Sequence, residues 1–266
     1  MLRALKAAAI AAAGTALVIA PGALAQDQLD GEPNMNGVWQ ALNTANWSLE
    51  PHSAEAIPSL VSSIGALGGI PAGLGVVDGG EIPYLPEALA KRDENRASFP
   101  EGDPEAKCYL PGIPRATYMP FPFQIIQSGG GADILMVYEY ASTNRVIHMR
   151  EHDAAPIDTW MGLSNGSWDG DTLVVETTAQ NGETWMDRAG DYLSPTATVT
   201  ERFTLDGPNL IRYEATIEDP SVYSEPWTIR MPLYRRMEAN AQLLEFKCVP
   251  FAEEMMYRDL KPEGVE

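Results

Sequence analysis

Short runs of β-forming residues follow one another through the second half of the chain, and this pattern limits the possible folds more than any other feature. The runs cover residues 123–127, 134–140, 145–150, 172–178, 197–205, 210–217, 227–234 and 242–248. Gly, Asn, Asp or Pro bounds them, and the connections are short with few helix-forming segments. This order favours antiparallel neighbours. We therefore predict a mainly β fold, an antiparallel barrel or a sandwich.

Two local patterns refine this prediction. Residues 206–209 (DGPN) have the length and chemistry of a hairpin turn. Pro232 lies inside one run, where it indicates a sheet edge or a bulge because proline cannot donate to a neighbouring strand. Residues 160–171, which contain Trp160, Trp168 and Asp171, are predicted to form a tight turn that leads into the strand at 172–178.

The first 25 residues have the features of a secretory signal peptide. Arg3 and Lys6 precede an apolar stretch over residues 7–20, and the A-x-A sequence at 23–25 predicts cleavage after Ala25. The stretch is shorter than the roughly 20 residues that a membrane-spanning helix needs. We therefore expect a periplasmic or secreted protein without a membrane span, an uncleaved N-terminal anchor being the alternative.

The rest of the chain divides by composition. Residues 26–100 are predicted to form an irregular and helical arm packed on the core, with a helix over 86–96 that begins at Pro86. Residues 101–266 are predicted to form the antiparallel β domain. The formal net charge is −19, and loss of Arg3 and Lys6 makes it more negative by two. Such a chain repels phosphate backbones, so we expect no nucleic-acid partner.

The chain has two cysteines, Cys108 and Cys248. An isolated pair in an exported protein is typical of a disulfide, which would tie the start of the β region to its end. Two buried free thiols are the alternative. Neither cysteine belongs to a pattern typical of a metal site.

Several motifs resemble an uncharacterised family of exported bacterial proteins. They are residues 108–115 (CYLPGIPR), 119–125 (MPFPFQI), 138–140 (YEY), 145–147 (RVI), 160–162 (WMG), 168–175 (WDGDTLVV), 184–187 (TWMD), 200–203 (TERF), 218–220 (EDP) and 226–228 (PWT). The resemblance covers roughly residues 83–248 and implies a β-barrel-like domain, lipocalin-like in shape. It implies no mechanism. Residues 150–156 and 193–194 depart from the family pattern, which carries histidines there.

Residues 148–152 (HMREH) match the H-x-x-E-H signature of some zinc proteases. The signature requires a helix that places both histidines on one face, whereas Val146 and Ile147 belong to a β-forming run. On a strand, His148 and His152 would lie about 13 Å apart. A strand end with a solvated turn is the favoured interpretation, and we predict no metal site.

Acidic side chains and one arginine are the candidate catalytic residues. Asp171, with Asp169, belongs to the predicted turn, Asp187 belongs to a second Trp-containing turn, and Glu139 could reach Arg145 across a hairpin. Two carboxyl groups beside aromatic walls can differ in pKa and act as acid and base. The alternatives are ordinary turn chemistry for Asp169 and Asp171, and a structural pair for Glu139 and Arg145.

Aromatic residues near the same turns are candidate ligand contacts, because Trp and Tyr combine a large apolar area with one polar atom. They are Trp160, Trp168, Trp185, Tyr138 and Tyr140. Their alternative role is to fill the core.

Two functional classes therefore remain open. The first is a binder of a small apolar or aromatic molecule in a cavity lined by Trp and Tyr. The second is a cofactor-free lyase, isomerase or hydratase that uses Asp, Glu and Arg in the same cavity. No serine-nucleophile elbow, phosphate loop or dinucleotide fingerprint supports a third class, and no cofactor is predicted.

Overall fold

The computed structural model describes residues 27–56, 69–150 and 153–249. The predicted signal peptide at 1–25 lies outside the described residues. The helices and short 3-10 helices are α2 (Pro86–Ala97), η2 (Pro104–Lys107), α3 (Arg115–Tyr118) and η3 (Tyr140–Ser142). The strands are β1 (Gln28–Leu29), β2 (Glu32–Pro33), β3 (Gly37–Ala41), β4 (Glu55–Ala56), β5 (Gly69–Ile70), β6 (Phe123–Ile126), β7 (Ile134–Tyr138), β8 (Asn144–His148), β9 (Leu163–Asp169), β10 (Thr172–Thr178), β11 (Thr198–Leu205), β12 (Leu210–Glu218) and β13 (Trp227–Arg235).

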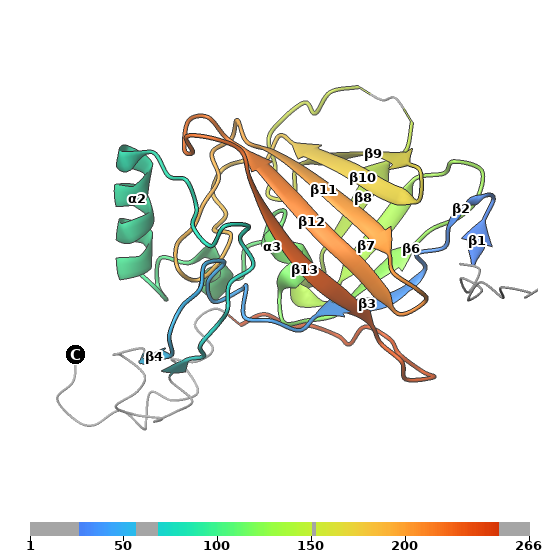
Figure 1. Ribbon diagram of the computed structural model, residues 1–266, viewed down its shortest axis with the longest axis horizontal. Coiled ribbons are helices and arrows are strands. Elements are labelled where there is room, and N and C mark those ends of the chain that lie inside the picture. Colours follow the sequence, from blue (N-terminus) through green and yellow to red (C-terminus); the bar gives the residue numbers. More distant parts are fainter. Residues whose placement is uncertain (1–26, 57–68, 151–152, 250–266) are drawn as a thin grey trace, which may run out of the picture.

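Nine strands close into a barrel in the order β10-β11-β12-β13-β3-β6-β7-β8-β9, which confirms the predicted mainly β fold (Figure 1). Neighbouring strands are antiparallel except β8 and β9, which pair in parallel through Ile147 with Ser164 and His148 with Asn165. The long connection between β8 and β9 allows this parallel pair, because parallel neighbours cannot be joined by a tight hairpin.

Buried and less buried residues alternate along β11, β12 and β13, the longest strands of the barrel. In β11 the side chains of Val199, Glu201, Phe203 and Leu205 face inward. The turn predicted at 206–209 joins β11 to β12, and Asp206 N–H donates to Leu210 O at 2.8 Å.

Pro232 lies where β13 changes its neighbour. Arg230 N–H donates to Val76 O at 2.9 Å, and β3 begins to pair with β13 at Leu233. Pro232 has no N–H to offer between these two contacts. The predicted interruption of the sheet is therefore present on this side of β13, while its other side pairs continuously with β12.

Three expectations differ from the structure. Residues 242–248 form no strand; they run along the surface and end at the disulfide. Residues 163–169 form strand β9, so the tight turn is confined to Gly170 and Asp171. Residues 26–100 also contribute a barrel strand, β3, whose buried Trp39 lies in the core. The predicted helix is present as α2 and lies beside the barrel (Figure 1).

Large side chains fill the barrel interior. Those of Trp39, Phe123, Tyr138, Phe203 and Tyr213 are all less than 3% exposed. The short helix α3, whose four residues are buried, packs against β3 on the side of the barrel towards α2. Close packing of this kind makes the interior a core rather than an open ligand chamber.

Candidate functional site

An ion pair lies inside the barrel. Arg145 Nη2 on β8 is 2.7 Å from Glu201 Oε2 on β11, and the two side chains are 2% and 0% exposed. Tyr213 Oη and Thr117 Oγ1 donate to Glu201 Oε1 at 2.8 Å and 3.4 Å. Burial opposes the charge of Arg145, but Glu201 and the neighbouring tyrosines together raise the pKa of its guanidinium above its usual value. The guanidinium therefore stays charged inside the barrel, with Tyr138 and Tyr213 beside it.

A second buried network lies where α3 meets η2. Arg115 donates from Nη1 and Nη2 to the Asp103 carboxylate, both at 2.9 Å, and from Nη2 to Glu105 Oε2 at 2.6 Å. Arg188 donates from Nη2 to Glu105 Oε1 at 2.7 Å and from Nε to Oε2, the oxygen that Arg115 also contacts, at 2.9 Å. Burial raises the pKa of Glu105, but the attraction of Arg115 and Arg188 outweighs it, so this pKa is lowered. The network fixes α3 to the loops around it.

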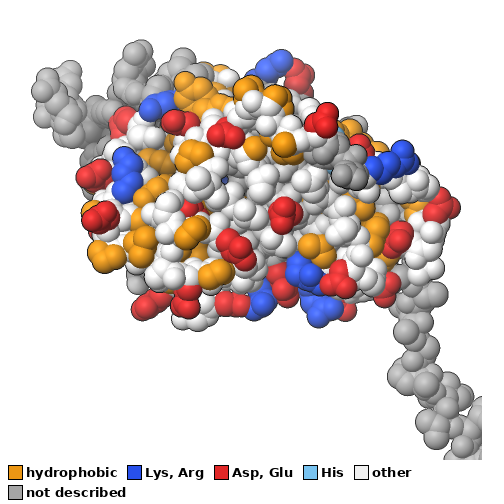
Figure 2. All heavy atoms as spheres, turned by 90° about the horizontal axis from the view of Figure 1, so that it is seen from above, with side chains coloured by type: hydrophobic (Ala, Val, Ile, Leu, Met, Phe, Trp, Pro, Cys, Tyr) orange, Lys and Arg blue, Asp and Glu red, His pale blue; other side chains and the backbone are white. Residues whose placement is uncertain are grey.

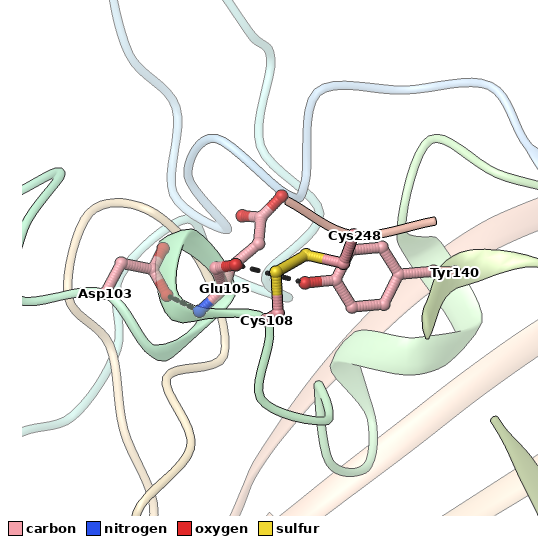
Figure 3. The surroundings of a disulfide bond; sticks show 5 residues. All are labelled: Asp103, Glu105, Cys108, Tyr140 and Cys248. Carbon is pink, nitrogen blue, oxygen red and sulfur yellow. Dashed lines mark hydrogen bonds between the residues drawn. A yellow bond between two sulfur atoms is a disulfide. The ribbon is translucent and has the colours of Figure 1, made fainter. Parts of the chain in front are cut away.

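The predicted disulfide between Cys108 and Cys248 is present, and it lies near Glu105 of this network (Figure 3). Cys108 ends η2, and the Tyr140 hydroxyl donates to Glu105 O at 3.3 Å beside the sulfur atoms (Figure 3). Phe246 packs on Tyr140 and Phe121, with ring centroids 5.1 Å away from each. The end of the described chain is thus attached to the loops that carry the network.

Asp187 and Asp191 form a buried carboxyl pair, 0% and 1% exposed. Asp187 accepts hydrogen bonds from the backbone N–H groups of Leu49, Ala189 and Asp191 at 2.8–3.1 Å. Tyr84 Oη donates to Asp191 Oδ1 at 2.8 Å, and no donor among the described residues reaches Asp191 Oδ2. Burial and the neighbouring Asp191 carboxyl raise the pKa of Asp187 well above its usual range. A proton bound between the two groups removes the repulsion between them.

A groove of about 600 Å³ lies on the side of the barrel that carries α2, and one of its wall residues is Tyr84, whose hydroxyl bonds to Asp191. Tyr84 reaches it from the loop before α2, and Leu89 and Arg92 reach it from α2 itself. The remaining wall residues are Glu50, Pro51, Gly80, Glu81, Ile82 and Pro83. The ring of Tyr84 also belongs to an aromatic cluster. Its centroid lies 6.4 Å from that of Tyr192 and 5.0 Å from that of Tyr223.

A second hollow, of about 400 Å³, lies on the surface at the end of β13. Leu42, Tyr234 and Arg236 are among its wall residues. Neither hollow is lined by the residues of the barrel interior. The groove beside Tyr84 combines an aromatic wall, opposite charges and perturbed titratable groups, which are the usual marks of a small-molecule site.

The predicted catalytic residues are not gathered in one place. Asp171 is exposed in the turn before β10, whereas Asp187 follows the end of this strand, which is about 20 Å long. Glu139 accepts a hydrogen bond from Leu244 N–H at 2.8 Å, and Arg145 pairs with Glu201 rather than with Glu139. Asp169 is exposed and pairs with Arg202 at 2.7 Å.

The predicted ligand-contacting aromatics have separate environments. Trp160 stacks on Tyr109 with centroids 4.7 Å apart, and Trp168 is half-buried against the core. Trp185, Tyr138 and Tyr140 are buried, and burial raises the pKa of Tyr138 to about 12. Residues that the sequence did not single out, such as Tyr84, Glu50 and Arg92, line the groove instead.

The H-x-x-E-H match is only partly described, because Glu151 and His152 lie outside the described residues. His148 Nδ1 is 3.3 Å from Asp133 Oδ2, at the exposed end of β8. Within the described ranges, no group of three or more His, Cys, Asp or Glu side chains is placed to hold a metal ion.

No protein-family model, curated protein or solved structure matches this chain. Among residues 27–56, 69–150 and 153–249, no helix is both long and apolar enough to cross a bilayer. The fold and the site together define a disulfide-linked β-barrel with a packed interior and a groove on its flank. Acidic side chains are spread over the face of the molecule seen in Figure 2, in keeping with the net charge of −19.

Proposed function

We propose that the protein is an exported small-molecule binder whose ligand lies in the groove beside Tyr84. The observation that carries this proposal is the position of the groove, which places an aromatic ring, apolar side chains and charged side chains around one accessible volume of about 600 Å³. This volume falls within the range of known ligand sites. The filled barrel interior argues against a chamber of the lipocalin type.

Binding is favoured over catalysis because the candidate catalytic groups have other partners. Asp187 accepts three backbone N–H groups, Arg145 is paired inside the barrel, and Asp171 is exposed in a hairpin turn. The expected ligand is a small aromatic or partly apolar molecule. Export after cleavage at Ala25 belongs to the same proposal, and a mature protein that begins at Gln26 in the periplasm or the medium would support it.

The test is a thermal-shift screen of the oxidised mature protein against small aromatic and amphipathic compounds, followed by calorimetry on the hits. Leu89→Trp fills the groove, and Leu42→Trp is the matched control because it fills the other hollow. We expect Leu89→Trp to abolish binding and Leu42→Trp to preserve it. The opposite result, or binding that survives both substitutions, would place the ligand elsewhere.

A further inference from the structure

The groove carries opposite charges from two segments of the chain. Glu50, which follows Leu49, and Arg92, on α2, both line it. No ion pair joins them within the described ranges. Burial, Asp191 and Glu81 raise the pKa of the Glu50 carboxyl, and the attraction of Arg92 opposes this rise. Glu81, another wall residue, adds a further negative charge. Two carboxyl groups and one guanidinium therefore line the same groove.

Both charged groups keep bonding capacity for a ligand. Glu50 Oε1 accepts a hydrogen bond from Ile82 N–H at 2.7 Å, which fixes the carboxylate and leaves Oε2. Arg92 Nε lies 3.2 Å from the exposed Asp93 carboxylate but makes no hydrogen bond. A guanidinium has five N–H donors, so most of its capacity is unused in the described structure.

Tyr84 forms an aromatic wall beside Arg92, whose guanidinium carbon lies over the ring, 5.8 Å from its centroid. The hydroxyl of Tyr84 is fixed by Asp191, and its ring packs against Tyr223 with centroids 5.0 Å apart. Ile82 and Leu89 add apolar surface beside it. A ligand with a ring or an aliphatic side chain would cover this wall while its polar ends meet the two charges.

We propose that the groove binds a small zwitterion, of the size of an amino acid or a dipeptide. Its ammonium group lies on Glu50, its carboxylate on Arg92, and its side chain against Tyr84. This inference rests on the proposed binding function of the groove and names the ligand class. Because both ends are used, a molecule that lacks either charge should bind more weakly.

The test measures binding of L-phenylalanine and glycyl-L-phenylalanine to the mature protein by calorimetry, with phenethylamine and 3-phenylpropionate as single-charge analogues. We expect a zwitterion to bind at least about tenfold more tightly than either analogue, as loss of one charge-assisted contact implies. Glu50→Gln and Arg92→Gln should each weaken it by a similar factor. The glutamine at position 50 still offers an oxygen to Ile82 N–H, so the wall is preserved.

Glu87→Gln and Lys91→Gln are the matched controls, since both residues lie on α2 outside the groove lining. They should leave zwitterion affinity unchanged. If zwitterions bind but Glu50→Gln and Arg92→Gln have no effect, the proposed ligand class is wrong. If only uncharged compounds bind and Leu89→Trp abolishes this, the groove function stands and the zwitterion proposal fails. If nothing binds, both fail.

Discussion

Arg145 and Glu201 face each other across the barrel interior, with Nη2 and Oε2 2.7 Å apart and both side chains at most 2% exposed. They come from strands that are not neighbours in the barrel, β8 and β11. A buried pair of this kind contributes little net stability, since its attraction mainly offsets the cost of removing two charges from water. Removing only one member of the pair lowers stability, because the remaining charge stays buried without its partner.

The first prediction concerns this pair. Arg145→Met should destabilise the protein by about 3–5 kcal/mol, because Glu201 is left uncompensated. Arg145→Met with Glu201→Gln should recover most of the loss, and the glutamine keeps an oxygen for the Tyr213 hydroxyl. Urea unfolding of the two single variants and the double variant checks this. Additive losses in the double variant would mean that the two charges do not interact.

Glu201 also indicates how far the sequence could predict this interior. The alternation through β11 puts position 201 on the same face as Val199 and Phe203, so its burial could have been foreseen. Its pairing with Arg145 could not have been foreseen, because that contact crosses the interior and depends on how the barrel closes. Seven of the nine barrel strands were predictable from runs bounded by turn residues, but β3 was not, and the run at 242–248 forms no strand. β9 was missed because its Gly, Ser and Asn residues have low β propensity, and pairing with β10 and β8 overrides that.

The groove was harder to predict. Glu50, Tyr84 and Arg92 come from segments with no strand pattern, and only the tertiary fold brings them together. Asp187 was singled out from its neighbouring tryptophan, but its buried partner Asp191 was not. Local spacing could place Asp171 in a turn, but it could not show that β10 separates this turn from residues 184–187.

The second prediction concerns the disulfide. Cys108 and Cys248 are 140 residues apart in the sequence, and closing so long a loop stabilises the folded state by about 4–5 kcal/mol in a chain-entropy estimate. The double variant Cys108→Ser, Cys248→Ser should therefore unfold at lower urea concentration. Reductant should shift the wild-type midpoint towards that of the variant and leave the variant unchanged. Equal midpoints for oxidised protein and variant would contradict the estimate.

The third prediction concerns pH. Burial and Asp191 raise the pKa of Asp187, so the folded protein holds a proton that the unfolded chain releases near pH 4. The stabilising contribution of this proton is fully present below about pH 4 and is lost as pH rises through the folded-state pKa. Asp187→Asn should therefore flatten the fall in unfolding free energy above pH 4. Denaturant titrations at several pH values measure this slope.

Asp206→Asn is the control for this experiment. Asp206 lies in an exposed hairpin turn before Gly207, and Asn-Gly is an equally good turn sequence. The pH slope of this variant should match that of the wild type. An unchanged slope in Asp187→Asn would show that the buried carboxyl pair does not hold the extra proton.

The last prediction compares two glycines with positive φ. A Cβ on Gly190 (φ +92°) would lie 2.7 Å from Arg96 N and 2.8 Å from Arg92 O, so this residue lets the 187–191 loop touch the backbone of α2. A Cβ on Gly170 (φ +58°) would meet nothing within 4 Å. Gly170→Ala should therefore cost only about 1–2 kcal/mol of backbone strain. Gly190→Ala adds overpacking, for a total of about 3 kcal/mol or more.

Because α2 carries Leu89 and Arg92, Gly190→Ala should also disturb the groove. Asn95 Nδ2 donates to Gly190 O at 3.0 Å, and this contact would be strained as the helix moves away from the loop. Ligand affinity should fall in Gly190→Ala and stay unchanged in Gly170→Ala, measured at a temperature where both variants are folded. Equal stabilities and affinities in the two variants would mean that the position of α2 does not depend on its contact with Gly190.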